Sequence, residues 1–365
     1  MQKGEEPLFF LWTWTIVFLF CPCQVALLEC KNSFLLPFWN AIFGLFSERE
    51  ILIFSDSEGF FLIITILLVA SMLSFFVFMK FIYRFQSRIF ETLHYFLLAC
   101  VFIIFVKYGL DKLMMLQFTA PESNLMFTEV GNLDKDILFW TTMGTSRLFN
   151  WLTGGIEVTA TLFLLFKRTR RLGLIILFLS TIYIVILNFS FNIGVKLFSL
   201  ILLGTLLTLN WNTFTFLFRF LLGFGEEGDQ AVEKKVYLPI FKVVLGASVI
   251  VLMVQINSNS KIVNKLQGAY TSIQSDRLDY IFINQQNYWI EQAKTGERRS
   301  FEIIGQGKTE IKLRDDFGDM KIIQFHKNDK GRYRFQDVNG ESFTFEKMDL
   351  SKANILQDKT HLIVP

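Results

Sequence analysis

The chain has 365 residues, of which 52% are hydrophobic and 19% are charged, and 43 of them are phenylalanine. Soluble domains carry about a quarter charged residues, so this composition argues against a wholly soluble protein. The formal net charge of +3 is too close to balance to indicate binding to nucleic acid. Most of the apolar residues precede Asn257, and the remainder has the composition of a soluble domain.

Long apolar segments recur through the first 256 residues. A transmembrane helix needs about 20 consecutive apolar residues, and this criterion predicts about seven crossings, at residues 8–28, 60–82, 89–110, 146–166, 172–189, 195–209 and 238–256. Residues 213–224 are apolar but too few to cross, so they are expected to lie in the interface. The amino terminus lacks the small-residue site of a cleavable signal, and the first segment is therefore expected to stay as an anchor.

Basic residues in the short loops set the expected orientation. Arg84 and Arg88 follow the second segment, KRTRR (residues 167–171) follows the fourth, and Lys234 and Lys235 precede the seventh. Loops rich in lysine and arginine stay in the cytoplasm. The sequence therefore predicts a multi-pass protein of a bacterial inner membrane, with a cytoplasmic amino terminus and a periplasmic carboxyl-terminal part.

The pattern changes after Asn257. Short runs such as DYIFIN, TEIKLRD and GRYRFQD alternate apolar with polar residues, and turn clusters such as KTGE and KNDKG separate them. Alternation with a period of two is typical of half-buried β-strands. Residues 258–365 are therefore expected to form a small extracytoplasmic all-β domain, either an antiparallel sheet or a small barrel.

Four stretches of the apolar part carry a family resemblance. They are YGLDKLMMLQFTAPESNL (108–125), FWTTMGTSRLFNWLTGGIE (139–157), LLFKRTRRLG (164–173) and NFSFNIGVKLFSLILL (188–203). In order and spacing they resemble the YG-K-QF-P, W-MG-S-G-E, RRT-G and N-DVPVK-S patterns of the DoxX-like family of bacterial membrane proteins, above all a longer form from Bacteroidetes-type bacteria. Asn192 and Gly194 stand where the family pattern has an acid and a proline.

The resemblance implies a four-helix membrane module that works near quinone, since smaller DoxX and DoxD relatives are associated with thiosulfate:quinone oxidoreduction. The expected fold is an α-helical transmembrane bundle of about seven spans, with a DoxX-like four-helix module, followed by the all-β domain. The expected domains are a two-span region (1–87), the module (88–209), an interfacial segment with the last helix (210–257) and the β-rich domain (258–365).

Polar residues inside apolar segments supply the candidate site. An ionisable residue at membrane depth costs about 2.5–3.5 kcal/mol on insertion scales, so it needs a partner in the protein interior. Glu157 is such a residue, with Lys112 or Lys196 as its counter-charge, or Asn188 as a hydrogen-bond partner of a neutral carboxyl. The candidate ligand-binding residues are Tyr108, Lys112, Gln117, Arg147, Glu157, Asn188, Asn192 and Lys196. Alternatively, these residues only hold helices together.

Motifs for intrinsic chemistry are absent from the sequence. It has no nucleotide-binding loop, GxSxG elbow, haem CxxCH or iron–sulfur cysteine set, and the Glu91–His94 spacing has no second half for a metal site. No catalytic residue, metal or intrinsic cofactor is therefore expected. The expected function is a non-catalytic subunit that binds quinone or lipid in a polar pocket and a membrane or periplasmic protein through its β-domain. The alternatives are a membrane-anchored assembly or scaffold protein, and a quinone-linked oxidoreductase.

Overall fold

The protein divides into two compact units in the computed structural model. The model describes residues 56–221, residues 266–353 apart from 276, 285–286, 316, 329–330 and 338–339, and the single residues 41, 44 and 356. The first unit, here the helical unit, is drawn from Met1–Gln117 and Trp151–Gln255. The second, here the barrel unit, is drawn from Phe118–Asn150 and Ile256–Pro365.

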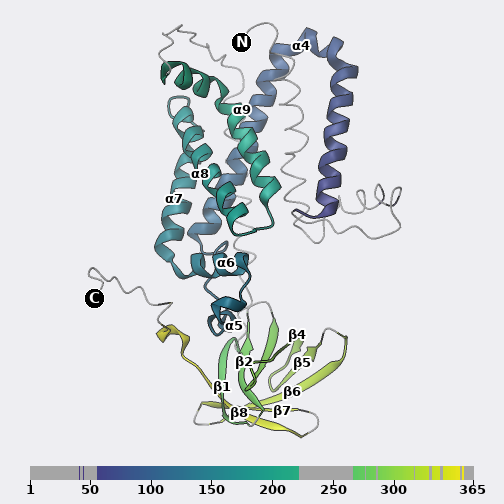
Figure 1. The fold of residues 1–365 in the computed structure, drawn as a ribbon, viewed down its shortest axis with the longest axis vertical. Helices are drawn as coiled ribbons and strands as arrows, with labels where there is room; N and C mark the ends of the chain where they lie inside the picture. Colours follow the sequence, from purple (N-terminus) through teal and green to yellow (C-terminus); the bar gives the residue numbers. More distant parts are fainter. Residues whose placement is uncertain are drawn as a thin grey trace, which may run out of the picture. The chain divides into compact units, whose positions relative to one another are not determined.

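Helices dominate the described part of the chain up to residue 221 (Figure 1). The helical unit contains α4 and most of α7, together with α8 and α9. The barrel unit takes α5, a 3₁₀ turn at Val130–Asn132, α6 and the first turn of α7. The bounds are α4 Glu58–Leu113, α5 Ser123–Met126, α6 Lys135–Thr145, α7 Arg147–Phe163, α8 Arg170–Ser190 and α9 Lys196–Leu221.

The predicted seven-span bundle is wrong, and with it the description of the chain as a multi-pass, DoxX-like membrane protein. Within the described residues, α8 is the one helix whose length and composition suit a membrane crossing. The segments predicted at 60–82 and 89–110 belong to a single 56-residue helix, α4. With 17 residues, α7 is shorter than the roughly 20 that a crossing needs, and the apolar part of α9, Lys196–Trp211, is also short.

Two of the predicted segments, 8–28 and 238–256, lie outside the described residues. The error within the described residues has a physical origin. A hydropathy window measures how apolar a stretch is, whereas hydrogen bonding and capping decide where a helix begins and ends. In α4, the charged stretch around Arg84 and Arg88 continues the helix instead of ending it.

One apolar cluster holds the helical unit together. The most deeply buried members are Leu98 and Val101 of α4, Leu177 of α8 and Leu206 of α9, with Leu164 at the end of α7. Burying such a side chain contributes about 1.5–3 kcal/mol relative to leaving it exposed. The cluster packs α4 against α7, the two helices that carry the candidate site.

Eight strands of the barrel unit form a closed antiparallel barrel in which each strand pairs with the next and β8 pairs with β1 (Figure 1). Alternate residues face the interior, as the pairs Trp289↔Phe301 and Tyr333↔Phe345 illustrate. The bounds are β1 Gly268–Gln274, β2 Leu278–Ile283, β3 Tyr288–Ala293, β4 Arg298–Gln306, β5 Glu310–Arg314, β6 Met320–Lys327, β7 Arg332–Asp337 and β8 Ser342–Lys347.

The segment between α5 and the 3₁₀ turn packs on the outside of the barrel. The Phe127 ring lies 5.1 Å from the Tyr280 ring and 5.6 Å from the Phe282 ring. The Arg298 guanidinium donates to Thr128 Oγ1 at 2.5 Å and to the Phe127 carbonyl at 2.9 Å. The barrel unit is therefore built from two parts of the chain that are more than a hundred residues apart.

Tyr270 makes the barrel sensitive to alkaline pH. Its hydroxyl donates to the Leu266 carbonyl at 2.5 Å, and burial, assisted by the neighbouring Tyr333, raises the pKa of the Tyr270 hydroxyl above the ordinary phenol value. A group whose pKa is raised on folding contributes stability that is complete below its unfolded pKa, about 10, and is lost as the pH rises further.

Tyr270→Phe is expected to lower the free energy of unfolding near neutral pH by about 0.5–1.5 kcal/mol, through the lost hydrogen bond. Above about pH 10 this difference should shrink, because the variant has no phenol to ionise. Tryptophan-fluorescence unfolding curves across that range would measure both effects. The control is Tyr288→Phe, whose side chain is exposed. If Tyr270→Phe and wild type lost the same free energy of unfolding above about pH 10, Tyr270 would not be the group whose ionisation destabilises the barrel.

Candidate functional site

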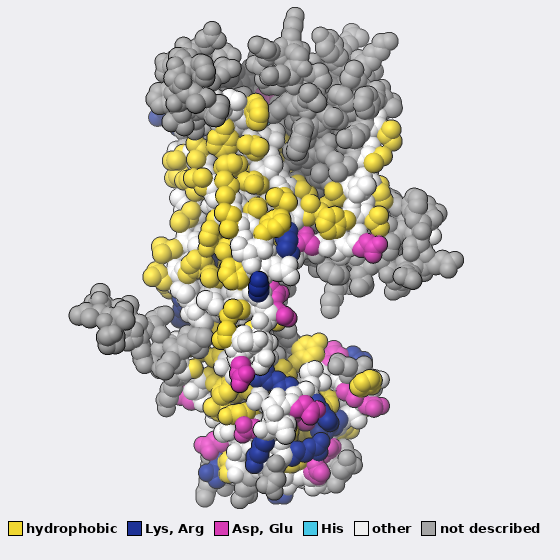
Figure 2. Space-filling model, viewed as in Figure 1, with side chains coloured by type: hydrophobic (Ala, Val, Ile, Leu, Met, Phe, Trp, Pro, Cys, Tyr) yellow, Lys and Arg dark blue, Asp and Glu magenta, His cyan; other side chains and the backbone are white. Residues whose placement is uncertain are grey.

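The helical unit has an inverted distribution of polar and apolar side chains. On α8, Leu172, Leu179, Tyr183, Ile186 and Phe189 form an exposed apolar stripe. Figure 2 shows hydrophobic side chains over much of the described surface of this unit, whereas charged side chains of both signs are interspersed over the barrel unit. The buried polar or charged side chains of α4, α7, α8 and α9 include Lys112, Glu157, Thr161, Arg170, Thr181, Asn188, Ser199, Thr205 and Asn210.

Most of these buried polar groups satisfy themselves locally. The hydroxyls of Thr161, Thr181 and Thr205 donate to the carbonyls four residues earlier, at 2.6, 2.7 and 3.0 Å. Asn210 Nδ2 donates to the Leu174 and Leu206 carbonyls, at 3.2 and 3.0 Å, whereas its buried Oδ1 accepts no hydrogen bond from the described residues. Such bonds let a polar side chain stay inside a helical core without a ligand.

Lys112 and Glu157 form an ion pair inside the helical unit. The Lys112 ammonium donates to Glu157 Oε1, and the two side chains are only 8% and 5% exposed. Lys112 lies in the last turn of α4, and Glu157 lies in the middle of α7. A buried ion pair offsets the cost of its desolvation only if its remaining donors and acceptors also form hydrogen bonds.

Two glycines let α4 and α7 approach closely beside this pair. A Cβ placed on Gly154 would lie 2.7 Å from the Gly109 carbonyl oxygen and 2.9 Å from Lys112 Cβ. A Cβ on Gly109 would lie 2.7 Å from Val158 Cγ2. Small residues at a helix crossing allow the backbones to come this near, and here they bring the lysine and the glutamate within hydrogen-bonding range.

The pair leaves hydrogen-bonding capacity unused. Glu157 Oε2 is buried and accepts no hydrogen bond from the described residues. An ammonium group has three N–H donors, and Lys112 uses one of them on Glu157 within the described residues. The site therefore offers one buried anionic acceptor next to cationic donors.

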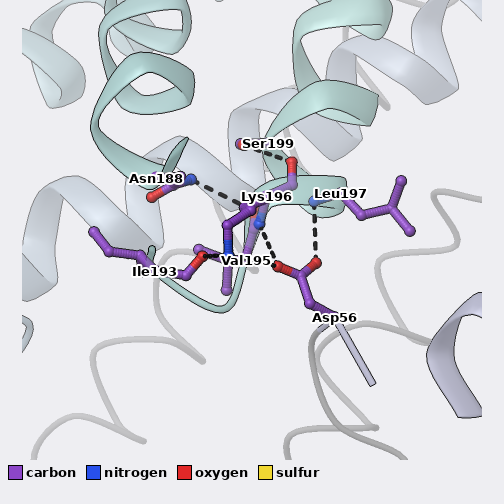
Figure 3. Close-up of polar contacts among 7 residues, drawn as sticks. All are labelled: Asp56, Asn188, Ile193, Val195, Lys196, Leu197 and Ser199. Carbon is purple, nitrogen blue, oxygen red and sulfur yellow. Dashed lines mark hydrogen bonds and ion pairs between the residues drawn. The ribbon is translucent and has the colours of Figure 1, made fainter. Parts of the chain in front are cut away.

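Lys196, the other predicted counter-charge, has a different partner (Figure 3). The Asp56 carboxylate accepts from the backbone N–H groups of Lys196 and Leu197, at 2.8 and 3.1 Å, and lies 3.9 Å from the Lys196 ammonium. The Lys196 ammonium also donates to the Ile193 carbonyl at 3.1 Å. Asp56 thus caps the amino terminus of α9, where a carboxylate stabilises unpaired N–H groups and the helix dipole.

The predicted asparagines belong to the same turn between α8 and α9. Asn188 Nδ2 donates to the Val195 carbonyl at 3.5 Å (Figure 3), and within the described residues no hydrogen bond joins Asn188 to Glu157. Asn192 is exposed and has a φ of 56°, a left-handed conformation that asparagine tolerates. These two residues shape the turn that presents Lys196 to Asp56.

The three remaining candidates do not join the pair through any described hydrogen bond. The Tyr108 ring packs 6.4 Å from the Phe198 ring, with the Lys107 ammonium 5.0 Å from the Tyr108 centroid. Gln117 has a buried Oε1 that accepts no hydrogen bond from the described residues. Arg147 is exposed at the start of α7.

Sequence reasoning missed Asp56. Its only signal is an acid shortly before a long apolar stretch, which usually indicates a cap of the helix that follows it directly. Asp56 instead caps α9, which begins 140 residues later. Within the described residues, no group of three or more His, Cys, Asp or Glu side chains lies close enough together to hold a metal ion.

The comparisons with known proteins identify a relative without assigning it an activity. The chain is 35% identical over 109 residues to the uncharacterized protein YwoB of Bacillus subtilis (strain 168), and the match spans 29% of this chain and 68% of YwoB. No protein-family model and no solved structure matches the chain. At this identity, and with two thirds of the relative covered, the chain belongs to the same family as YwoB.

Proposed function

We propose that the helical unit binds the polar headgroup of a lipid-soluble molecule, a quinone or a lipid, beside Lys112 and Glu157. The protein would act as a binding subunit and would not itself catalyse a reaction. The observation that carries this proposal is Glu157 Oε2, a buried carboxylate oxygen without a hydrogen-bond partner among the described residues. Buried polar atoms are normally paired, and an orphaned one calls for an explanation.

The chemistry of the pair suits a headgroup that both accepts and donates hydrogen bonds. A quinone carbonyl or a lipid phosphate can accept from the Lys112 ammonium. A quinol or lipid hydroxyl can donate to Glu157 Oε2, which forms a strong charge-assisted bond. The same two helices carry buried apolar side chains, such as Val106 and Ala160, which would accompany the apolar part of the same molecule.

The exposed apolar face supports a membrane location for the helical unit. Soluble proteins rarely expose large continuous apolar patches, and only 28% of the most apolar stretch of α8 is buried. A core helix of a soluble protein would instead be mostly buried. We place α8 across a bacterial inner membrane with its basic end, next to Lys167 and Arg168, on the cytoplasmic side.

The test is to identify lipid-soluble molecules that co-purify with the full chain from its native membrane in mild detergent. Mass spectrometry should find one quinone or lipid at about one copy per chain in wild type, and a clear loss in Glu157→Gln and Lys112→Gln. The matched control is Lys107→Gln, which removes a lysine of α4 from a partly exposed pair with Asp111. Full retention in both pocket variants would refute the proposal.

A scaffold function is the second candidate, favoured by one feature of the barrel. Phe317 and Met320, at the turn between β5 and β6, are 94% and 60% exposed. The Asp315 carboxylate accepts from the backbone N–H groups of Phe317 and Asp319, at 3.0 and 2.8 Å, so these two residues are tied to Asp315. An exposed aromatic side chain on a hydrogen-bonded turn suits docking into a pocket of a membrane or periplasmic protein.

The two candidates separate experimentally. On the scaffold hypothesis, Phe317→Ser abolishes co-purification of a stoichiometric partner, and Glu157→Gln leaves it intact. On the binding hypothesis, Glu157→Gln abolishes co-purification of the small molecule, and Phe317→Ser leaves it intact. A quinone-linked oxidoreductase would in addition require a redox cofactor from a partner protein.

A further inference from the structure

One end of the barrel carries two inward-facing lysines. Lys327 is the last residue of β6 and pairs with Tyr333, and Lys347 is the last residue of β8 and pairs with Tyr270. Directly paired residues of antiparallel strands project on the same side of the sheet. Because Tyr270 and Tyr333 belong to the barrel core, both lysines project on the inner side at the same end of the barrel, here the lysine mouth.

Aromatic contacts hold both ammonium groups in place. The Lys327 ammonium lies 5.5 Å from the centroid of the Tyr333 ring, and the Lys347 ammonium lies 5.8 Å from that of Tyr270. The two rings pack edge to face, 5.2 Å apart. A Cβ on Gly268 would lie 2.8 Å from Lys347 Cε, so the Lys347 stem runs across the β1 backbone. Both lysine side chains are exposed at the rim of the barrel, and these contacts position their stems over the tyrosine rings.

The charges at this mouth are not compensated within the described residues. Neither Lys327 nor Lys347 forms an ion pair there, whereas Lys321 of the same strand as Lys327 lies 3.2 Å from Glu291 and 3.7 Å from Asp337. Burial, together with the positive charge of Lys327, lowers the pKa of the Lys347 ammonium. Neighbouring cations repel, and an anion bound by both lysines would offset that repulsion.

We propose that the lysine mouth binds a phosphate-type anion through Lys327 and Lys347. A doubly charged oxyanion matches two ammonium groups, and lysine is a common point-charge ligand for phosphate. The anion can be free phosphate or the phosphomonoester of a lipid headgroup, and this site is independent of the pair at Lys112 and Glu157.

The full chain in a neutral detergent provides the first test, by calorimetric titration with inorganic phosphate at constant ionic strength. Wild type should bind, and both Lys327→Gln and Lys347→Gln should weaken binding by about tenfold or more, as expected for a lost charge-assisted contact. The matched control is Lys312→Gln, which removes one positive charge from an exposed position between two inward residues of β5. It should bind as wild type does.

A second titration separates the two sources of phosphate. Vesicles of phosphatidylcholine alone are compared with vesicles that also contain phosphatidic acid, whose phosphomonoester headgroup can carry two negative charges, as inorganic phosphate can. Binding only to the latter, with the same dependence on Lys327 and Lys347, would assign the site to a lipid headgroup. Binding of inorganic phosphate would assign it to the free anion. Equal affinities in all three glutamine variants, or no binding to either probe, would overturn the proposal.

Thermal unfolding midpoints show whether a variant loses phosphate binding only because it no longer folds. Removing one of two repelling lysines should leave the midpoint unchanged or raise it. Phosphate should raise the midpoint of wild type and of Lys312→Gln only, because a ligand stabilises the folded state in proportion to its binding. A stabilisation by phosphate that persists in Lys327→Gln and Lys347→Gln would also refute the site.

Discussion

Glu157→Leu, with Lys112 left in place, is expected to lower the free energy of unfolding by about 3–5 kcal/mol, the usual consequence of leaving one buried charge without its partner. The Lys112 side chain is only 8% exposed, so little water can reach it to replace the lost carboxylate. Lys112→Met should lower the free energy of unfolding by a similar amount, because it leaves the buried Glu157 without its partner. Unfolding of the detergent-solubilised full chain, followed by circular dichroism of its helices, would measure both losses.

The double variant Lys112→Met/Glu157→Leu distinguishes stability from binding. Replacing both members of a buried pair by apolar residues of similar size is often neutral or stabilising by about 1–4 kcal/mol. The double variant should therefore unfold near the wild-type midpoint and still lack the bound quinone or lipid. A double variant that retained the small molecule would show that the pair is structural. Single variants as stable as wild type would show that the pair is not buried.

Gly154→Ala and Gly155→Ala are expected to change stability in opposite directions, although the residues are neighbours on α7. The Gly154 Cβ would lie 2.7 Å from the Gly109 carbonyl and 2.9 Å from Lys112 Cβ, whereas the Gly155 Cβ meets nothing within 4 Å. Overpacking at Gly154 should cost about 1–3 kcal/mol. Alanine at Gly155 should gain up to about 1 kcal/mol in helix propensity.

The same pair of variants tests how the site is built. If the Gly109–Gly154 crossing brings Lys112 to Glu157, Gly154→Ala should also weaken retention of the bound molecule, and Gly155→Ala should not. The readouts are the unfolding midpoint and the amount of ligand per chain after purification. Equal behaviour of the two variants would mean that the crossing does not control the pair.

The candidate site shows where sequence reasoning ends. Glu157 was singled out because an acid in an apolar segment needs a partner, but Lys112, Lys196 and Asn188 were all open as that partner. The choice depends on the crossing of α4 and α7, since Lys112 is 45 residues from Glu157 along the chain. Lys196 instead contacts Asp56, which lies 140 residues earlier in the chain, and no local sequence pattern reveals this contact.

For the helices and strands too, the sequence predicts local features but not contacts between distant residues. Period-two alternation is local, so the sequence by itself determined that the part after Asn257 forms short strands. Whether these make a sheet or a barrel depended on the pairing of β1 with β8, for example Tyr270 with Lys347. The predicted spans failed because hydropathy cannot locate helix ends, and residues 60–110 lie in one helix, α4.

Composition and periodicity thus determined which residues are apolar, which acid is out of place, and where strands form, because these properties depend on neighbours within a few positions. The tertiary structure alone decided which lysine meets Glu157 and that Phe127 packs against Tyr280 and Phe282 of the barrel. It also decided that Lys327 and Lys347 share one mouth. Each of these is a contact between distant parts of the chain, set by close packing and barrel closure.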